Sequence, residues 1–176
     1  MKNKFPLVSD GVIKLLPFET THLTKKYVSW LNDADIVKYS QQRHKKHSLI
    51  SCKKYFDEQQ SSNNYFLAIE LEDEKSTHVG NIGIAVDNND KIADLAIIVC
   101  KSVWGLGIGS RAWILALNSI FEHLDIRMVT CETMAINQPM INLIKRSKMK
   151  INATLPKRFI FEGKEVDKVV ASIIKK

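Results

Sequence analysis

Three of the chain's seven glycines stand at alternate positions in residues 103–110 (VWGLGIGS), between an apolar run that ends at Cys100 and a segment with helical spacing. A strand followed by a glycine-rich turn and a helix start exposes several amide groups where the helix dipole is positive. Because glycine has no Cβ, an anion can approach that backbone closely. The segment therefore predicts a strand, a turn and a helix that together bind an anion, and pyrophosphate is the usual ligand of such a turn.

Two well-known phosphate-binding turns do not fit this segment. A Walker loop requires Gly-Lys-Ser/Thr, whereas the sequence here is Gly109-Ser110-Arg111. A dinucleotide-binding fold requires G-x-G-x-x-G after the first strand of alternating βα units, whereas the spacing here is G-x-G-x-G and several strands precede it. A glycine-rich turn without a ligand remains the alternative.

The segments before the turn have the composition of strands with short connections. Residues 65–71 (YFLAIEL), 79–86 (VGNIGIAV) and 92–100 (IADLAIIVC) are rich in apolar residues and are separated by turn-forming polar residues. Short connections favour antiparallel neighbours, because a parallel pair needs a long crossover. We therefore expect an antiparallel meander at the centre of a sheet.

Helices and further strands are expected on both sides of the meander. Helical spacing and caps predict helices at 21–31, from 48 to a polar break at 59–64, at 110–124 and at 139–147. Further strands are expected at 11–17, 128–134, 159–161 and 168–174. The prediction is a single α+β domain over residues 1–176, with a mixed, mostly antiparallel central sheet flanked by helices.

The composition narrows the expected cellular compartment and the kinds of molecule that the protein binds. The formal net charge of +7 favours an anionic partner such as nucleic acid, a phosphorylated cofactor or an acidic surface. Three cysteines, Cys52, Cys100 and Cys131, are odd in number and lack metal-ligand spacing, so we expect a reducing cytoplasm and no metal site. No apolar stretch approaches the roughly 20 residues that span a bilayer, so no membrane partner is expected.

Residues 104–109 (WGLGIG) resemble the pyrophosphate loop of the GNAT superfamily of acetyl-coenzyme-A-dependent N-acetyltransferases, usually Gln/Arg-x-x-Gly-x-Gly/Ala. Tryptophan at the first position, as in Trp104, is frequent in the branch that resembles ribosomal-protein and amino-sugar acetyltransferases. Residues 137–146 (NQPMINLIKR) resemble the family's asparagine-led helix, and 92–97 (IADLAI) resemble its splayed central strand. These motifs occur in the family's order over roughly residues 65–150.

The resemblance implies acetyl-coenzyme A as cofactor and places its pyrophosphate on the amides of residues 106–111. It also implies that the pantetheine arm pairs like an added strand with residues 98–100, where a backbone amide near Ile98 would donate to the oxyanion, and meets Asn137. The expected cofactor-binding residues are Ile98, Val99, Cys100, Trp104, Leu106, Gly107, Ile108, Gly109, Ser110, Arg111 and Asn137.

Two carboxylates are candidates for the general base that removes a proton from the attacking amine. Asp94 stands in an otherwise apolar strand and matches a frequent acidic position of the family, whereas Glu132 matches the base position of some members. We favour Asp94, with an ordinary surface carboxylate as the alternative for each. Many members carry a tyrosine that protonates the leaving thiolate where this chain has Ile144, so the resemblance leaves that proton donor open.

The acceptor is expected at a basic segment, residues 39–48 (YSQQRHKKHS), which the resemblance places in the substrate wall. Its candidate substrate-binding residues are Tyr39, Arg43, His44 and His47. Similar segments occur in acetyltransferases that acylate an amine on a nucleotide-linked deoxysugar for surface polysaccharides, and basic side chains suit a diphosphate. A solvated charged loop is the alternative.

Other functions remain open at the level of sequence. A protein N-terminus, as in the ribosomal-protein acetyltransferases, would replace the sugar as acceptor within the same enzyme class. A basic nucleic-acid-binding module is the alternative from another class, but the sequence has neither an aromatic-interleaved basic strand set nor a recognition helix. Ile144 also raises the alternative of a cofactor-binding protein without catalysis. The oligomeric state is open, with a homodimer as one option.

Overall fold

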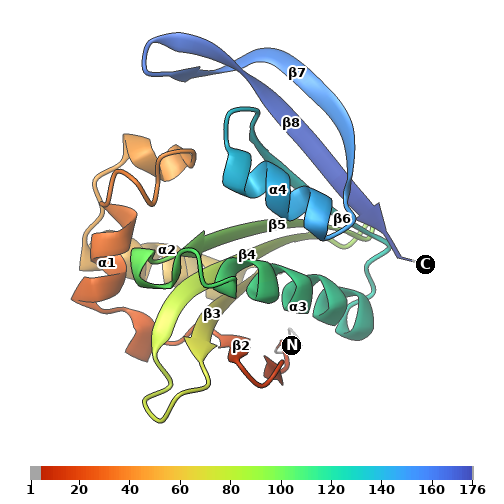
Figure 1. Ribbon diagram of the computed structural model, residues 1–176. Helices are drawn as coiled ribbons and strands as arrows, with labels where there is room; N and C mark the ends of the chain where they lie inside the picture. The colour runs from red at the N-terminus through yellow and green to blue at the C-terminus, as the bar shows by residue number, and fades with distance from the viewer. Residues whose placement is uncertain (1–4, 176) are drawn as a thin grey trace.

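The computed structural model describes residues 5–175, whose strands form one eight-stranded sheet in the order β1-β2-β3-β4-β5-β6-β8-β7 (Figure 1). Neighbouring strands are antiparallel except β5 and β6, which are parallel. The strands are β1 (Val8–Ser9), β2 (Ile13–Pro17), β3 (Tyr65–Leu71), β4 (His78–Asp87), β5 (Ile92–Val99), β6 (Met128–Met134), β7 (Lys150–Phe161) and β8 (Lys164–Ile174). The helices are α1 (Lys25–Leu31), α2 (Leu49–Ser61), α3 (Ile108–His123) and α4 (Gln138–Arg146), with short 3-10 turns η1 (Thr20–His22), η2 (Gln41–His44) and η3 (Lys101–Val103). The α+β class and the mixed, mostly antiparallel sheet are as the sequence predicts.

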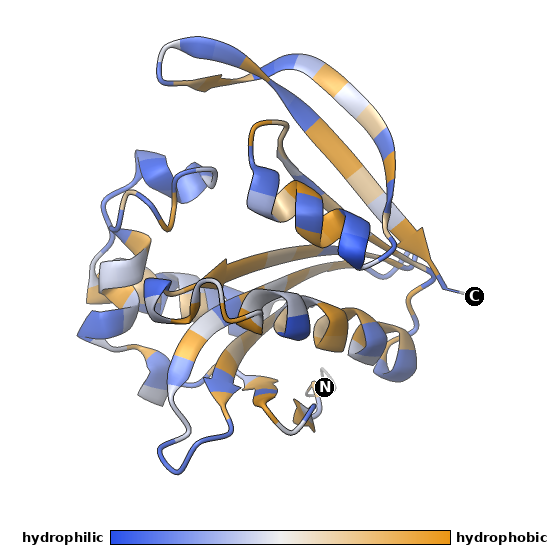
Figure 2. Ribbon diagram, in the orientation of Figure 1, coloured by the Kyte–Doolittle hydropathy of each residue, from blue (hydrophilic) through white to orange (hydrophobic). Residues whose placement is uncertain are grey.

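One face of the central strands packs against α3, and hydrophobic residues occur along the ribbons of both (Figure 2). Along β5, Ala93 and Leu95 are buried while Asp94 and Ala96 are exposed, which is the period of two that a sheet with one packed face requires. The indole of Trp113, from α3, is fully buried in this core. The face of β5 that carries Asp94 and Ala96 therefore points away from α3.

The sheet opens between β5 and β6. These two strands pair only over residues 92–94 and 128–130. Beyond Asp94, β5 keeps a neighbour in β4 alone, so one edge of residues 95–99 is paired by no strand of the described chain. An unpaired strand edge presents free backbone groups to which an extended segment can add.

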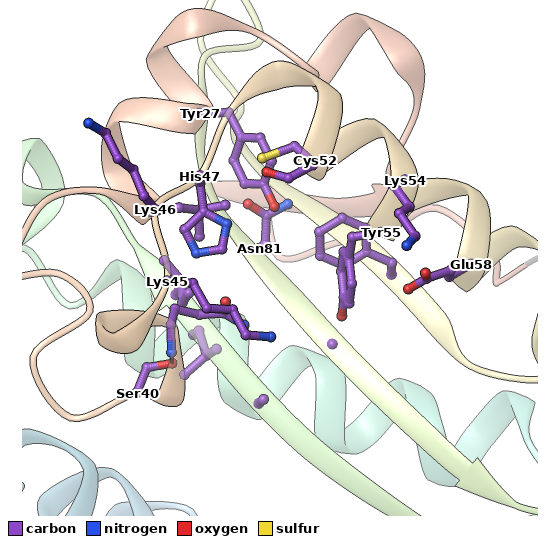
Figure 3. Close-up of a pocket in the computed structure, with 18 residues that line it drawn as sticks. Tyr27, Ser40, Lys45, Lys46, His47, Cys52, Lys54, Tyr55, Glu58 and Asn81 are labelled. Atoms are coloured by element: carbon purple, nitrogen blue, oxygen red, sulfur yellow. Dashed lines mark hydrogen bonds between the residues drawn. The ribbon is translucent and has the colours of Figure 1, made fainter.

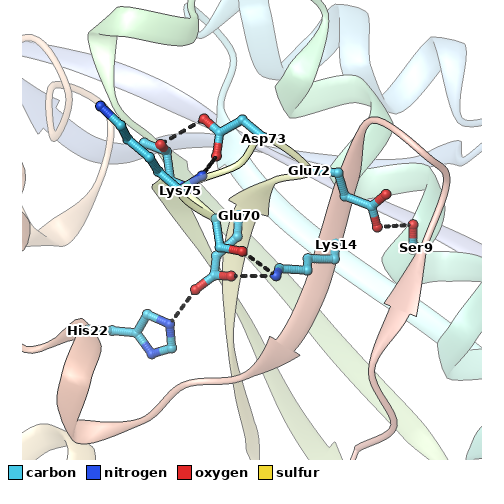
Figure 4. Close-up of polar contacts among 9 residues, drawn as sticks. Ser9, Lys14, His22, Glu70, Glu72, Asp73 and Lys75 are labelled. Carbon is cyan, nitrogen blue, oxygen red and sulfur yellow. Dashed lines mark hydrogen bonds and ion pairs between the residues drawn. The ribbon is translucent and has the colours of Figure 1, made fainter.

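A buried polar group on β3 fixes the N-terminal segment to the sheet (Figure 4). Nδ1 of His22 accepts a hydrogen bond from the Glu19 amide at 2.8 Å, so Nε2 carries the ring proton and donates to Glu70 Oε1 at 2.9 Å. Lys14 Nζ lies 3.1 Å from Glu70 Oε2. A carboxylate buried to this degree requires such partners, and here they join β2 and η1 to β3.

His78, at the start of β4, lies beside this group. Its ring centroid is 4.9 Å from those of His22 and Trp30, and its Nε2 donates to Gly80 O at 2.9 Å. Burial, with a smaller contribution from His22, lowers the pKa of His78 to about 4. The His78 ring is therefore neutral in the folded protein at neutral pH.

Element boundaries differ from the sequence prediction at several places, and three of the differences have a clear cause. The expected helix at 21–31 is divided into η1 and α1, because Thr24 is extended and its side chain caps α1. Helix α3 begins two residues earlier than predicted, because Gly107 adopts a left-handed conformation at its N-cap. Strand β7 begins at Lys150 rather than at 159. Nearly all of β7 is exposed, so it lacks the apolar alternation that marks a strand in a sequence.

The structure also bears on membranes and metals. Within residues 5–175, no helix is both long and apolar enough to cross a membrane. In the same part of the chain, no group of three His, Cys, Asp or Glu side chains is arranged to hold a metal ion. The three cysteines are free and buried.

Candidate active site

The glycine turn forms a cradle of amide groups at the start of α3. Gly105 and Gly107 both have a φ of +77°, a left-handed conformation that favours glycine, and Gly107 is the N-cap of α3. The amides of residues 107–110 have no backbone acceptor in the described structure, as expected for the first turn of a helix. Adjacent N–H groups at the positive end of a helix dipole fit the oxygens of a pyrophosphate.

Two of the predicted amide donors are already used within the protein. The Leu106 amide donates to Val103 O at 3.3 Å, and the Arg111 amide forms the first α-helical bond, to Gly107 O, at 3.1 Å. The Arg111 side chain is also engaged, since its Nη1 lies 2.9 Å from Asp10 Oδ2. The predicted cradle over residues 106–111 is therefore corrected to residues 107–110.

Gly109 and Trp104 border the space between the cradle and β5. A Cβ on Gly109 would lie 3.6 Å from Val99 Cγ2, an ordinary van der Waals contact, so a larger side chain there would project into this space. Trp104 Nε1 donates to Val99 O at 3.1 Å, which holds the indole against the end of β5. Trp104 therefore supports the loop from the strand side.

The open edge of β5 presents the backbone of alternate residues. The Cys100 amide donates to Val79 O, next to β4, at 2.8 Å. Because backbone groups alternate sides along a strand, Ile98 also directs its amide to β4, whereas Ile97 and Val99 direct theirs to the open edge. The predicted backbone pairing is therefore corrected: Ile97 and the amide of Val99 face the open edge, Val99 O is already bonded to Trp104, and Ile98 and Cys100 face β4.

A cavity of about 440 Å³ lies on the face of the β4–β5 pair that points away from α3 (Figure 3). Its floor comes from β4 and β5, and its walls come from α1, α2 and the segment between them. The lining residues are Tyr27, Leu31, Ser40, Gln42, Lys45, Lys46, His47, Ser51, Cys52, Lys54, Tyr55, Glu58, Phe66, Asn81, Gly83, Ala96, Ile97 and Ile98. The cavity therefore lies against residues 96–98 of β5, and these residues belong to the part of β5 that is not paired with β6.

Most of the charged residues that line the cavity are cationic. Its charged side chains are Lys45, Lys46, Lys54 and Glu58. Tyr27 and Tyr55 add hydroxyl groups whose pKa burial raises, so both remain hydrogen-bond donors at neutral pH. Lys46 directs its amino group away from the cavity, whereas Lys45 and Lys54 lie beside it (Figure 3), and the lining as a whole favours a ligand that carries negative charge.

The predicted substrate wall is divided between two places. His47 lines the cavity, as expected. Arg43 and His44 instead line a second hollow, beside the β7–β8 hairpin. Tyr39 packs its ring against that of Phe161, with 5.6 Å between the ring centroids. Of the four predicted substrate residues, His47 alone lies at the cavity.

The two candidate carboxylates have different surroundings. Asp94 lies where β5 and β6 separate, and Thr130 Oγ1 donates to its Oδ2 at 2.9 Å. Burial by the surrounding protein raises the pKa of Asp94, although the side chain reaches solvent, and Glu132 adds to the rise. Glu132 forms an ion pair with Lys168 and lines the second hollow. A raised pKa makes a carboxylate a better proton acceptor, but neither Asp94 nor Glu132 lines the cavity, so the identity of the base stays a prediction.

Asn137 has a structural role in α4. Its Oδ1 accepts from the Met140 amide at 3.3 Å, and its Nδ2 donates to Thr133 Oγ1 at 2.9 Å, which makes Asn137 the N-cap. A contact with the pantetheine arm stays a prediction. Ile144 is fully buried, so this position supplies no proton donor.

The sequence does not reveal most of the cavity lining. Tyr27, Lys54, Asn81 and Ala96 come from four separate elements, and no motif joins them. One signal was available, because Asn81 is the single polar side chain in the run 79–86 (VGNIGIAV).

The sheet is open beside β5, an amide cradle lies next to the free edge, and a cavity lies on the same strand. These features together define a group-transfer enzyme with a phosphorylated cofactor. The family description Acetyltransferase (GNAT) domain matches residues 13–150, and the chain belongs to this family. It is an acyltransferase, and its acetyl donor is acetyl-coenzyme A. No curated protein matched the sequence.

Solved structures with the same fold act on different acceptors. A spermidine N-acetyltransferase from Vibrio cholerae, in complex with CoA and spermine, has a TM-score of 0.83 and 15% identity, covering 94% of this chain and 96% of that one. An acetyl transferase from Salmonella typhimurium that modifies the N-terminal serine of a 50S ribosomal subunit protein has a TM-score of 0.80 and 16% identity, covering 98% and 99%. The self immunity acetyltransferase MccE, in complex with acetyl-CoA and AMP, has a TM-score of 0.80 and 15% identity, covering 95% and 94%. These likenesses show the fold and leave the acceptor open.

Proposed function

We propose that this enzyme acetylates a primary amine on a nucleotide-linked amino-deoxysugar. The observation that carries the proposal is the lining of the cavity, where Lys45, Lys46 and Lys54 outnumber a single carboxylate. Cationic side chains favour an acceptor that carries phosphate, and a nucleoside diphosphate supplies two such groups. The second hollow, with Arg158 among its basic side chains, offers further ligands for an anion.

Acetyl-coenzyme A supplies an activated thioester carbonyl to the reaction. In the proposed mechanism, the amides of residues 107–110 hold its pyrophosphate, and Ile97 and Val99 offer backbone groups to its pantetheine arm. An amide on this edge would be placed to donate a hydrogen bond to the carbonyl oxygen of a bound thioester. The chain thus orients the thioester beside the cavity that receives the amine.

In this mechanism the amine nitrogen would bond to the acetyl carbon, the C–S bond of the thioester would break, and the thiolate of coenzyme A would leave. Asp94 would take the proton from the amine, and solvent would return a proton to the thiolate. The pKa of Asp94 is raised, mainly by burial, which strengthens it as a base. Asp94 shares a face of β5 with Ala96, which lines the cavity, and two residues of a strand span about 7 Å. That separation suits proton transfer through one water molecule.

A protein N-terminus is the second candidate acceptor. The similarity to an acetyltransferase that modifies an N-terminal serine favours it. The AMP bound by MccE supports a nucleotide-bearing acceptor within this fold. A polyamine fits the cavity poorly, because its cationic amines would face the three lysines of the lining.

The compartment is part of the proposal. Cys52, Cys100 and Cys131 are free thiols, and thiols stay reduced in the cytoplasm. We therefore assign the enzyme to the cytoplasm.

Steady-state kinetics with acetyl-coenzyme A and four acceptors test this function. The acceptors are a uridine-diphosphate-linked 4-amino-4,6-dideoxysugar, the same sugar without the nucleotide, a peptide with a free N-terminal serine, and spermidine. We expect the highest kcat/KM for the nucleotide-linked sugar, with a loss of about 100-fold when the nucleotide is removed, because charge-assisted hydrogen bonds to phosphate are lost. A higher kcat/KM for the peptide would select the second candidate, and preference for the free sugar or spermidine would contradict both.

A further inference from the structure

Asn81 has an unpaired side-chain oxygen in the floor of the cavity. The residue lies on β4 and is only 5% exposed. Its Nδ2 donates to Leu67 O on β3 at 3.3 Å, but its buried Oδ1 has no hydrogen-bond partner in the described structure. Buried polar atoms are nearly always hydrogen-bonded in folded proteins. An unpaired buried acceptor therefore indicates that a ligand supplies the donor.

The orientation of the Asn81 amide follows from its neighbour. Leu67 O is a carbonyl oxygen and can only accept a hydrogen bond, so the amide nitrogen must face it. The reversed orientation would bring two oxygens together. Oδ1 of Asn81 is therefore the atom left for a ligand.

The position of Asn81 connects the cavity to the open edge of β5. Asn81 pairs with Ile98 in the β4–β5 register, and both residues line the cavity. Residues 97 and 99, on either side of Ile98, direct their backbone to the free edge where the acetyl donor is proposed to lie. A group that contacts Asn81 thus stands close to that edge.

A second orphan atom lies in the same cavity. Nε2 of His47, from the segment between α1 and α2, is buried without a partner, while Asn81 rises from the sheet (Figure 3). Within residues 5–175, these are the two buried side-chain nitrogen or oxygen atoms that have no hydrogen-bond partner. Both belong to one cavity, which indicates that a polar ligand completes it.

We propose that Asn81 is the residue that binds the acceptor amine. Its Oδ1 accepts a hydrogen bond from the amine N–H, which turns the nitrogen lone pair toward the acetyl group at the β5 edge. His47 Nε2 binds a second polar group of the same acceptor. This inference rests on the proposed acetyl transfer, but it applies to a sugar amine and to a peptide N-terminus alike, because both carry N–H groups.

Asn81→Leu tests the inference, since leucine has a similar volume and offers no acceptor atom. With whichever acceptor wild type turns over, we expect kcat/KM for that acceptor to fall by about 10-fold or more, the loss of one buried hydrogen bond to a neutral amine. The Kd of coenzyme A should stay within about threefold, because Asn81 does not lie at the cradle. Asn64→Leu is the matched control: Asn64 Oδ1 accepts from the Val86 amide at 3.1 Å, outside the cavity.

Asn81→Asp distinguishes amine binding from a structural role and serves if the leucine variant fails to fold. A carboxylate facing the bound amine stabilises its protonated form, so the acidic limb of the kcat profile, which reports the enzyme–acceptor complex, should move to higher pH while the acceptor still binds. Unchanged acceptor kinetics in folded Asn81→Leu, or an unmoved acidic limb in Asn81→Asp, would overturn the inference while leaving the transferase function intact. A wild-type protein that acetylates none of the four acceptors would instead contradict the proposed function, and the amine-binding role with it.

Discussion

Replacing Gly109 by valine tests the amide cradle with little disturbance of the fold. Gly109 lies within the first turn of α3 and has ordinary helical backbone geometry, unlike Gly107 with its φ of +77°. A Cβ at 109 would meet only Val99 Cγ2, at 3.6 Å. We therefore expect the free energy of unfolding to change by no more than about 1 kcal/mol, since a helical glycine is itself unfavourable by about that amount.

Cofactor binding should respond much more strongly than stability. The branched side chain would occupy the space between the cradle and β5, and it would keep the pyrophosphate from one or two of the free amides. Each hydrogen bond to a charged group contributes about 1.5–3 kcal/mol, so a total loss near 3 kcal/mol would raise the Kd of coenzyme A by roughly 100-fold. Isothermal titration calorimetry measures the Kd, and thermal unfolding reports the fold.

Two controls isolate the pyrophosphate contact. Asn118→Val places the same side chain on an exposed position in the middle of α3 and should bind coenzyme A like wild type. Pantetheine lacks the pyrophosphate, so its affinity should be the same for wild type and Gly109→Val. A folded Gly109→Val protein with unchanged Kd for coenzyme A would refute the assignment of the cradle.

Two further predictions concern titrating groups. Asp94→Asn should lower kcat by roughly 10² to 10⁴ fold without weakening coenzyme A binding. The acidic limb of kcat/KM, which arises as Asp94 becomes protonated, should disappear in that variant and persist in Glu132→Gln; the reverse ranking would transfer the role of base to Glu132. His78 has a pKa of about 4 in the fold against 6.5 for an ordinary histidine, so the unfolded chain takes up the proton first and stability falls as pH drops from 6.5 to 4. The free energy of unfolding should fall by about 3 kcal/mol over this pH range in wild type, as measured by urea unfolding. In His78→Phe the fall should be smaller by about 3 kcal/mol; equal pH dependence in both proteins would contradict the role of His78.

Local chemistry explains which parts of the fold and the site could be predicted. Strands β3 and β6 match the predicted bounds, since both carry apolar side chains that the core requires. The glycine turn was predictable because the cradle uses the backbone of consecutive residues, 107–110. Family membership, expected from this turn and the elements around it, is confirmed.

The parts that were missed depend on pairing between distant residues. The side toward which Ile98 directs its backbone follows from the β4–β5 register, which the sequence does not contain. The predicted basic wall is divided between two hollows because η2 carries Arg43 and His44 toward the hairpin, while His47 stays at the cavity. Only residues 159–161 of strand β7 were predicted, because the rest of this exposed edge strand needs no apolar pattern.

The charge of the cavity is the basis of the proposed acceptor, and reversing it is the most direct test of that claim. Lys45→Glu with Lys54→Glu changes the lining from three cations and one anion to one cation and three anions. Lys25→Glu with Lys164→Glu makes the same change in net charge outside both hollows. The measurement is the ratio of kcat/KM for the nucleotide-linked amino sugar to kcat/KM for spermidine. We predict that the ratio favours the sugar in wild type and in the control, and falls by at least about 100-fold in the cavity variant. A ratio that is the same in all three proteins would contradict the proposal that this cavity selects an anionic amine.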